Sequence, residues 1–153
     1  TGACMTVAVP AKGLSAVGDY PALGMVAFME WLAYDRVQHQ IDQESPIVKI
    51  ADRVKELRSK GILQRKSKKG DHQAQACVEN KNYTPEAQIR TTGLYLEAKY
   101  GEEWNVNHRL LAWVQRHAGW VVTHYLVIAE TGHTAHYAVN PTVGGRRCFS
   151  WTR

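Results

Sequence analysis

Two acidic residues, Asp42 and Glu79, have the type and spacing that suit metal-assisted chemistry. Asp42 follows the strand-like run RVQHQI, Glu79 lies early in a helix-like run, and 36 residues separate them. A helix and a strand between them would bring both carboxylates to one edge of a sheet, where they could share a divalent cation. Each also has a simpler interpretation, because Asp42 and its neighbour Glu44 suit a helix start and Glu79 suits a solvated helix face.

Basic residues are concentrated between these two acids. Residues 55–69 contain seven Lys and Arg side chains and one Glu. Such a run is commonly a solvated face. Beside a metal-binding acidic site, it would instead hold the phosphodiester backbone of a nucleic acid. The residues of this run that we assign to nucleic-acid binding are Lys60, Arg65, Lys66, Lys68 and Lys69.

The spacing of apolar residues and the positions of Pro and Gly predict the elements that position these residues. We expect strands within residues 1–13 and at 36–42 and 62–66. We expect helices at about 21–33, from Ser45 as N-cap to before Gly61, from 73 to 101, from Asn107 as N-cap to 128, and at 134–139. Pro85 is expected to kink or split the third of these helices. This order predicts an α/β domain with helices packed on a small sheet.

The remaining aromatic and metal-ligand side chains show no obvious site. Trp113 and Trp120 lie seven residues apart and suggest packing anchors on the last long helix, with an oligomer contact as the alternative. The seven His residues form no ligand grouping, and His117 and His124 are expected in the core or an interface. Three Cys residues without CxxC spacing argue against both a disulfide framework and a zinc site.

Composition and charge limit the possible classes of protein. The 153 residues suit one domain, and 44% hydrophobic with 22% charged residues is a globular composition. A net charge of +5 favours a polyanionic partner. No apolar run of about twenty residues or signal-like leader is present, so we expect no membrane span. Because the first residue is Thr1, we expect a piece of a longer chain.

Four stretches carry a resemblance to a known family: YDRVQHQIDQESPIVKIADRV, KSKKGDHQAQACVEN, EAQIRT and LLAWVQRHAGWVVTHYLV. They resemble the C-terminal two-thirds of the integrase catalytic core of copia-type retrotransposons and retroviruses. The resemblance covers roughly residues 5–139. Its most specific part is DQE after a strand, followed about thirty-five residues later by QAxxxVEN at the start of a helix.

The resemblance implies an RNase H-like fold, N-terminally truncated, with a small mixed sheet flanked by helices. It implies that Asp42 and Glu79 are catalytic residues that bind Mg2+ or Mn2+, in a family that performs 3′-end processing and strand transfer of DNA. Residues 67–72 resemble the mobile loop beside that site. The helix that faces DNA in the family corresponds to the one that carries Lys81, Gln88 and Arg90.

The family's first catalytic Asp lies on a strand upstream of those found here, and neither Asp19 nor Asp35 takes its place. Residues 1–139 are therefore expected to be a partial integrase core from a transposable-element polyprotein, followed by a tail at 140–153. The expected partners are DNA and further copies of the chain, in the nucleus or a cytoplasmic particle. The alternative is a catalytically inactive module that binds nucleic acid or oligomerises.

Overall fold

The computed structural model describes residues 2–140 except 12, 15–17, 67–71 and 106, and it describes residues 72–80 by their backbone alone. Its elements follow the order α1 Tyr20–Trp31, β1 Arg36–Ile41, α2 Ser45–Leu57, β2 Gly61–Lys66, α3 His72–Tyr100, α4 Leu111–Tyr125, β3 Val127–Ile128, β4 His133–Thr134 and α5 Ala135–Val139. The expected α/β class, with helices beside a small sheet, is confirmed. In the described part of the chain, no helix is both long enough and apolar enough to cross a membrane.

The strands form two separate two-stranded sheets. β1 and β2 run parallel, in a register that pairs Arg36 with Gly61 and Ile41 with Lys66. α2 connects them, as a crossover between parallel strands requires. β3 and β4 form a short antiparallel pair near α5. The single three-stranded sheet that the sequence suggested is therefore wrong for the described residues.

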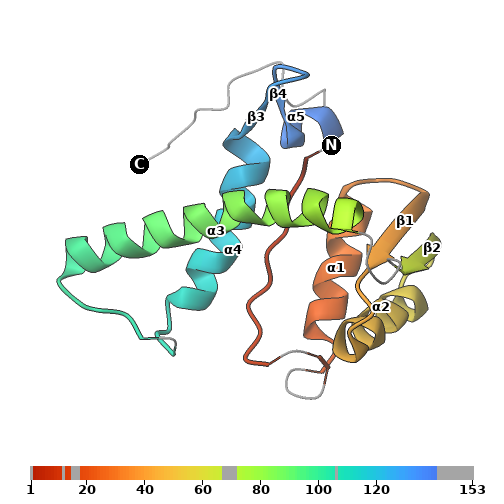
Figure 1. The fold of residues 1–153 in the computed structure, drawn as a ribbon, viewed down its shortest axis with the longest axis horizontal. Coiled ribbons are helices and arrows are strands. Elements are labelled where there is room, and N and C mark those ends of the chain that lie inside the picture. The colour runs from red at the N-terminus through yellow and green to blue at the C-terminus, as the bar shows by residue number, and fades with distance from the viewer. Residues whose placement is uncertain (1, 12, 15–17, 67–71, 106, 141–153) are drawn as a thin grey trace.

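The main core lies where α1, α2 and the β1–β2 pair meet (Figure 1). Ala22 and Met29 of α1 pack with the fully buried Val54 of α2, and Val37 and Ile62 from the two strands cover this cluster. The spacing of apolar residues that predicted this helix accounts for the packing of α2. Glu44 is the N-cap of α2, not Ser45, which is the first helical residue ahead of Pro46.

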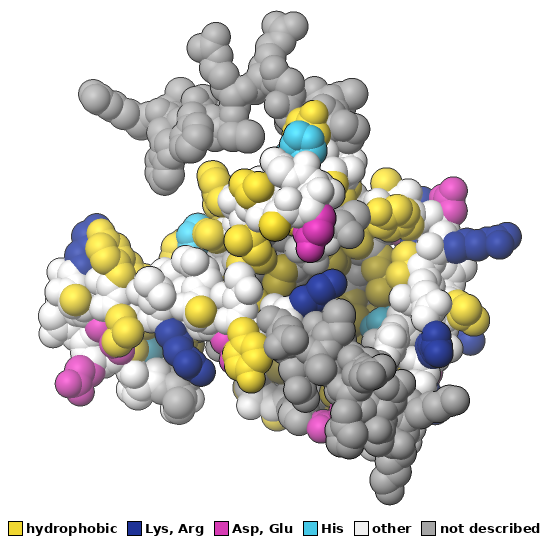
Figure 2. All heavy atoms as spheres, turned by 45° about the horizontal axis from the view of Figure 1, so that its top comes forward, with side chains coloured by type: hydrophobic (Ala, Val, Ile, Leu, Met, Phe, Trp, Pro, Cys, Tyr) yellow, Lys and Arg dark blue, Asp and Glu magenta, His cyan; other side chains and the backbone are white. Residues whose placement is uncertain are grey.

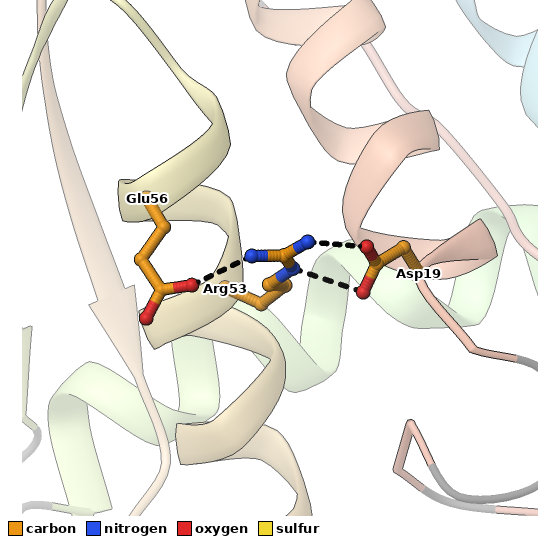
Figure 3. Close-up of polar contacts among 3 residues, drawn as sticks. All are labelled: Asp19, Arg53 and Glu56. Atoms are coloured by element: carbon orange, nitrogen blue, oxygen red, sulfur yellow. Dashed lines mark hydrogen bonds and ion pairs between the residues drawn. The ribbon is translucent and has the colours of Figure 1, made fainter.

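Two ion pairs fasten α1 to α2 at opposite ends. Near the start of α1, Arg53 donates hydrogen bonds to both carboxylate oxygens of Asp19, and its Nη1 contacts Glu56 at 2.8 Å (Figure 3). Near the other end, the buried Arg58 lies 3.3 Å from Glu30 and donates to the carbonyl oxygens of Gly61 (2.9 Å) and Tyr34 (2.5 Å). Arg58 thus ties together the end of α1, the end of α2 and the start of β2.

Residues 2–11 are extended but form no strand, which corrects the expectation for residues 1–13. They run between α1 and α4 (Figure 1). The backbone N–H of Cys4 donates to Oγ1 of Thr123 at 2.9 Å, and that hydroxyl donates back to the carbonyl of Cys4 at 2.8 Å. The hydroxyl of Thr6 donates to the carbonyl of Gln115. α4 therefore satisfies backbone groups that a partner strand would otherwise have paired.

Gly119 makes this close approach possible. A Cβ atom at position 119 would lie 2.7 Å from Oγ1 and 2.9 Å from the backbone nitrogen of Thr6. The buried face of α4 consists of Val114, Ala118, Gly119, Val122 and Thr123. The N-terminal segment packs on the small residues of this face. Leu110 is the N-cap, and the expected cap at Asn107 is wrong.

α3 is one helix of 29 residues with Pro85 inside it. It runs across α4 as a single rod, and the two helices pack together (Figure 1). The expected split at Pro85 does not occur. The Pro85 ring is buried, so packing compensates for the backbone hydrogen bond that this residue cannot donate.

Candidate functional site

Asp42 lies directly after β1, at the edge of the sheet where both parallel strands end. Its side chain is exposed, and its Oδ1 accepts a hydrogen bond from the backbone N–H of Gln43 at 2.7 Å. Lys66, the last residue of β2, pairs with Ile41 in the register and is also exposed. An acidic and a basic side chain therefore share this edge of the sheet.

Glu79 lies on α3, in the third turn of the helix. Its side chain is outside the described residues, so only its place on the backbone is known. Lys68 and Lys69, with the rest of the expected loop, also lie outside them. β2 ends at Lys66 and α3 begins at His72, so the chain passes from the sheet edge that carries Asp42 into the helix that carries Glu79.

The basic residues expected to contact nucleic acid are divided between distant places. Arg65 and Lys66 are exposed at the end of β2, near Asp42. Lys60 precedes β2 at the opposite end, where its Nζ lies 3.7 Å from Glu30 and 3.4 Å from Asp35. Figure 2 shows Lys and Arg side chains scattered over the described part of one face, not gathered into one patch.

The three residues expected on the DNA-facing helix are all on α3. Lys81 and Arg90 are exposed, and Gln88 is half-buried with its Nε2 donating to Oγ1 of Thr92 at 3.1 Å. Arg90 also lines a cavity between α3 and the segment that leads into α4. The helix therefore carries two exposed cations, Lys81 and Arg90, while the Gln88 side chain is hydrogen-bonded within the helix.

Carboxylate oxygens such as those of Asp42 are the ligands that Mg2+ prefers. Among the described residues, no group of three or more His, Cys, Asp or Glu side chains could hold a metal ion. Asp42 and Glu79 are the two carboxylates that the sequence predicted for a metal site, and the side chain of Glu79 lies outside the described residues. The donor chemistry of Asp42 fits a divalent cation that is held jointly with other oxygen ligands.

His39 and Gln64 face each other across the strand pair and point to the core side. Nδ1 of His39 and Nε2 of Gln64 are buried without a hydrogen-bond partner among the described residues. Burial lowers the pKa of His39 because it disfavours the charged imidazolium. The His39 ring is therefore neutral at pH 7 and contributes no positive charge to the nearby sheet edge.

A continuous series of stacked rings joins α4 to α1, which the sequence did not reveal. Along α4 the ring centroids of Trp113 and His117 are 4.7 Å apart, those of His117 and Trp120 5.6 Å, and those of Trp120 and His124 4.6 Å. We refer to this series, which includes the three rings described next, as the aromatic arc. The spacing of four, three and four residues places its rings on one helix face, and this periodicity is the signal that could have revealed it.

The aromatic arc continues through α5 into α1. His124 stacks on His136 of α5 at 4.4 Å, His136 stacks on Trp31 at 6.1 Å, and Trp31 stacks on Phe28 at 5.7 Å. Trp113 and Trp120 are 53% and 46% exposed, so they are not the buried packing anchors that we expected. The arc thus presents large aromatic rings to solvent.

Comparison with known proteins found no matching protein-family model, no matching curated protein and no matching solved structure.

Proposed function

We propose that residues 1–139 are part of an integrase-type catalytic core with an RNase H-like fold, whose parent reaction is metal-dependent 3′-processing and strand transfer of DNA. The observation that carries this proposal is the parallel β1–α2–β2 unit followed by α3. It places Asp42 at the edge where both strands end, and the next helix from that edge carries Glu79. The resemblance of the DQE and QAxxxVEN motifs supports the same assignment.

In this proposal Asp42 and Glu79 bind Mg2+ or Mn2+ through their carboxylate oxygens. The metal, when bound, polarises a phosphate and lowers the pKa of the attacking water or hydroxyl. Asp42 holds its carboxylate in place through the hydrogen bond from Gln43. Arg65 and Lys66, exposed beside it, contact the neighbouring phosphates and orient the DNA strand.

A second candidate is a module that binds nucleic acid or oligomerises without catalysis. The observation that favours it is the number of acidic residues. Two carboxylates belong to the motif, and the other acidic residues before Asp42 form ion pairs with basic residues. Asp19 binds Arg53, and Asp35 lies beside Lys60 at the opposite end of the strands. Such a module would keep the DNA contacts and would not depend on a divalent cation.

Thermal unfolding during titration with Mg2+ or Mn2+ tests the catalytic proposal. A ligand that binds only the folded state, at 100 times its Kd, stabilises it by about 2.7 kcal/mol. We expect the Tm of the wild type to rise and the rise to disappear in Asp42→Asn and in Glu79→Gln. Glu86→Gln is the matched control, since Glu86 is exposed on the same helix, seven residues from Glu79.

A rise that the control retains and both test variants lose supports the metal site. An unchanged Tm in the wild type over millimolar Mg2+ and Mn2+ contradicts it and favours the second candidate. A rise that persists in both test variants assigns the metal to other residues and contradicts the roles given to Asp42 and Glu79.

A further inference from the structure

The aromatic arc encloses a hollow at the surface between α1 and α4. A cavity of about 230 Å³ lies there, and its walls include Phe28 and Trp31 from α1 and Trp120 and His124 from α4. Residues 4–6 of the extended N-terminal segment and Thr123 complete the lining. The volume is below that of a site for a drug-sized ligand. It suits one ring-sized group.

The four aromatic walls determine what kind of group fits the hollow. Flat, polarizable rings favour a flat ring as their neighbour, in an offset-stacked or edge-to-face arrangement. Neighbouring rings of the arc already stack at angles between 10° and 29°, so the surface is preorganised for a further ring. The backbone of Cys4 and the side-chain hydroxyl of Thr6 are hydrogen-bonded to α4, which fixes this wall of the hollow to the helix.

One positive charge faces this hollow. Arg116 lines it, and the described residues that line it include no Asp or Glu. Arg116 is exposed and forms no ion pair with a carboxylate of the described residues. A guanidinium that is free of protein partners favours a phosphate or a carboxylate, which it contacts through two parallel N–H donors. The hollow therefore combines an aromatic surface for a ring with a cation for an anion attached to it.

We propose that this hollow binds an unpaired nucleotide of single-stranded DNA, with the base among Trp31, Trp120 and Phe28 and the adjoining phosphate on Arg116. A flat base joined to a phosphate matches both features, and stacking on aromatic side chains tolerates any base. The choice of DNA rests on the proposed function, in which the chain acts on DNA ends. The contact itself uses neither Asp42 nor a metal ion.

Binding of a dye-labelled oligothymidylate to the full chain, measured by fluorescence anisotropy in EDTA, tests this proposal. Base stacking on an aromatic side chain contributes enough that Trp120→Leu should weaken binding about tenfold. Trp113→Leu is the matched control, because Trp113 is as exposed on the same helix and does not line the hollow. We expect the control to bind within twofold of the wild type.

The salt dependence of binding isolates the role of Arg116. Removal of one phosphate contact to a single strand should reduce the slope of log K against log salt concentration by about 0.7. We expect this reduction in Arg116→Gln, its recovery in Arg116→Lys, and no reduction in Arg109→Gln, where an exposed Arg outside the hollow is removed. Since Arg116 is exposed, its variants remain informative even if Trp120→Leu fails to fold.

Three outcomes would overturn the proposal: wild-type affinity and salt slope in both hollow variants, an equal loss in the Trp113 control, or equally effective competition by a duplex. Each would show that unpaired bases do not use the hollow. EDTA removes any contribution of a metal site. Oligonucleotide binding at the hollow, without metal-dependent stabilisation, would therefore overturn the catalytic proposal alone. Metal-dependent stabilisation without binding at the hollow would overturn this inference alone.

Discussion

The guanidinium of Arg53 contacts both carboxylate oxygens of Asp19, with Nε–Oδ1 at 2.9 Å and Nη2–Oδ2 at 2.6 Å. This two-point contact joins α2 to the residue that caps the start of α1. Hydrogen bonds from Arg53 and its charge hold the pKa of Asp19 below its usual 3.8. Arg53 thus stabilises the ionised form of the Asp19 carboxyl in the folded protein.

Asp19→Asn is expected to lower the free energy of unfolding near pH 7 and to have less effect in acid. A carboxyl whose pKa is lower in the folded state contributes stability above its unfolded pKa, and that contribution is lost as the pH falls through the folded pKa. The pH range over which this contribution is lost therefore lies below about 3.8. Urea unfolding of wild type and variant from pH 7 to pH 2 measures it.

Asp52→Asn serves as the control for the Asp19 experiment, because Asp52 is exposed on α2 beside Arg53. It should change stability little at any pH. A constant difference between Asp19→Asn and wild type throughout the acid range would contradict the predicted role of the Asp19 carboxylate.

Gly119→Ala is expected to destabilise the protein although Ala favours helices. The new Cβ would overlap the backbone nitrogen of Thr6, so the N-terminal segment or α4 must shift. Overpacking of this kind costs about 1–3 kcal/mol. Gly93→Ala in α3 is the matched control, since nothing lies within 4 Å of a Cβ there. It should stabilise by about 1 kcal/mol.

Urea unfolding of both glycine variants gives the comparison directly. If Gly119→Ala proves as stabilising as Gly93→Ala, the N-terminal segment does not pack on α4 as described. Loss of protection from hydrogen exchange at the Cys4 amide in Gly119→Ala, with normal protection elsewhere, would place the damage at the predicted contact.

The stability of the protein is expected to fall as the pH decreases below about 6.5, in part through His39. Burial lowers the pKa of His39, and burial together with His124 lowers that of His136. Below the unfolded pKa the unfolded chain binds more protons than the folded one, so stability decreases until the folded pKa is passed. His39→Gln should reduce the dependence of the unfolding free energy on pH, and His136 should account for the dependence that remains.

Unfolding free energies at intervals between pH 8 and pH 5 would provide the slope for wild type and His39→Gln. An NMR titration that places the pKa of His39 at or above 6.5 would contradict the prediction. Identical slopes in the two proteins would do the same, because a His with a lowered pKa must release protons on folding.

The spacing of apolar residues was sufficient to locate α1, β1, α2 and β2. The period of each helix or strand places its apolar side chains on one face, and that face packs against the neighbouring elements. Val54 is the clearest example, because it lies in the helix predicted from Ser45 and is fully buried. The place of Asp42 after β1 followed from the same reasoning. Its exposure and its hydrogen bond to Gln43 required the structure.

Long-range packing explains what the sequence did not predict. β-branched residues near the N-terminus suggested a strand, yet Cys4 and Thr6 pair with α4, more than a hundred residues away. That contact buries Ala118 and Gly119, so Trp113 and Trp120 remain at the surface. The spacing of Trp113, His117, Trp120 and His124 places these rings on one face of the helix, but it does not show whether that face is buried or exposed.

The hydrogen bonds between Cys4 and Thr123 also affect the order in which the protein folds. They close a loop of 119 residues, and contacts so distant in sequence slow the search for the native state. During synthesis Cys4 emerges before α4, so its backbone groups must wait until α4 has been synthesised before they find these partners. The unit of α1, β1, α2 and β2 can assemble earlier, from neighbouring segments, so we expect the N-terminal segment to be among the last parts to become ordered.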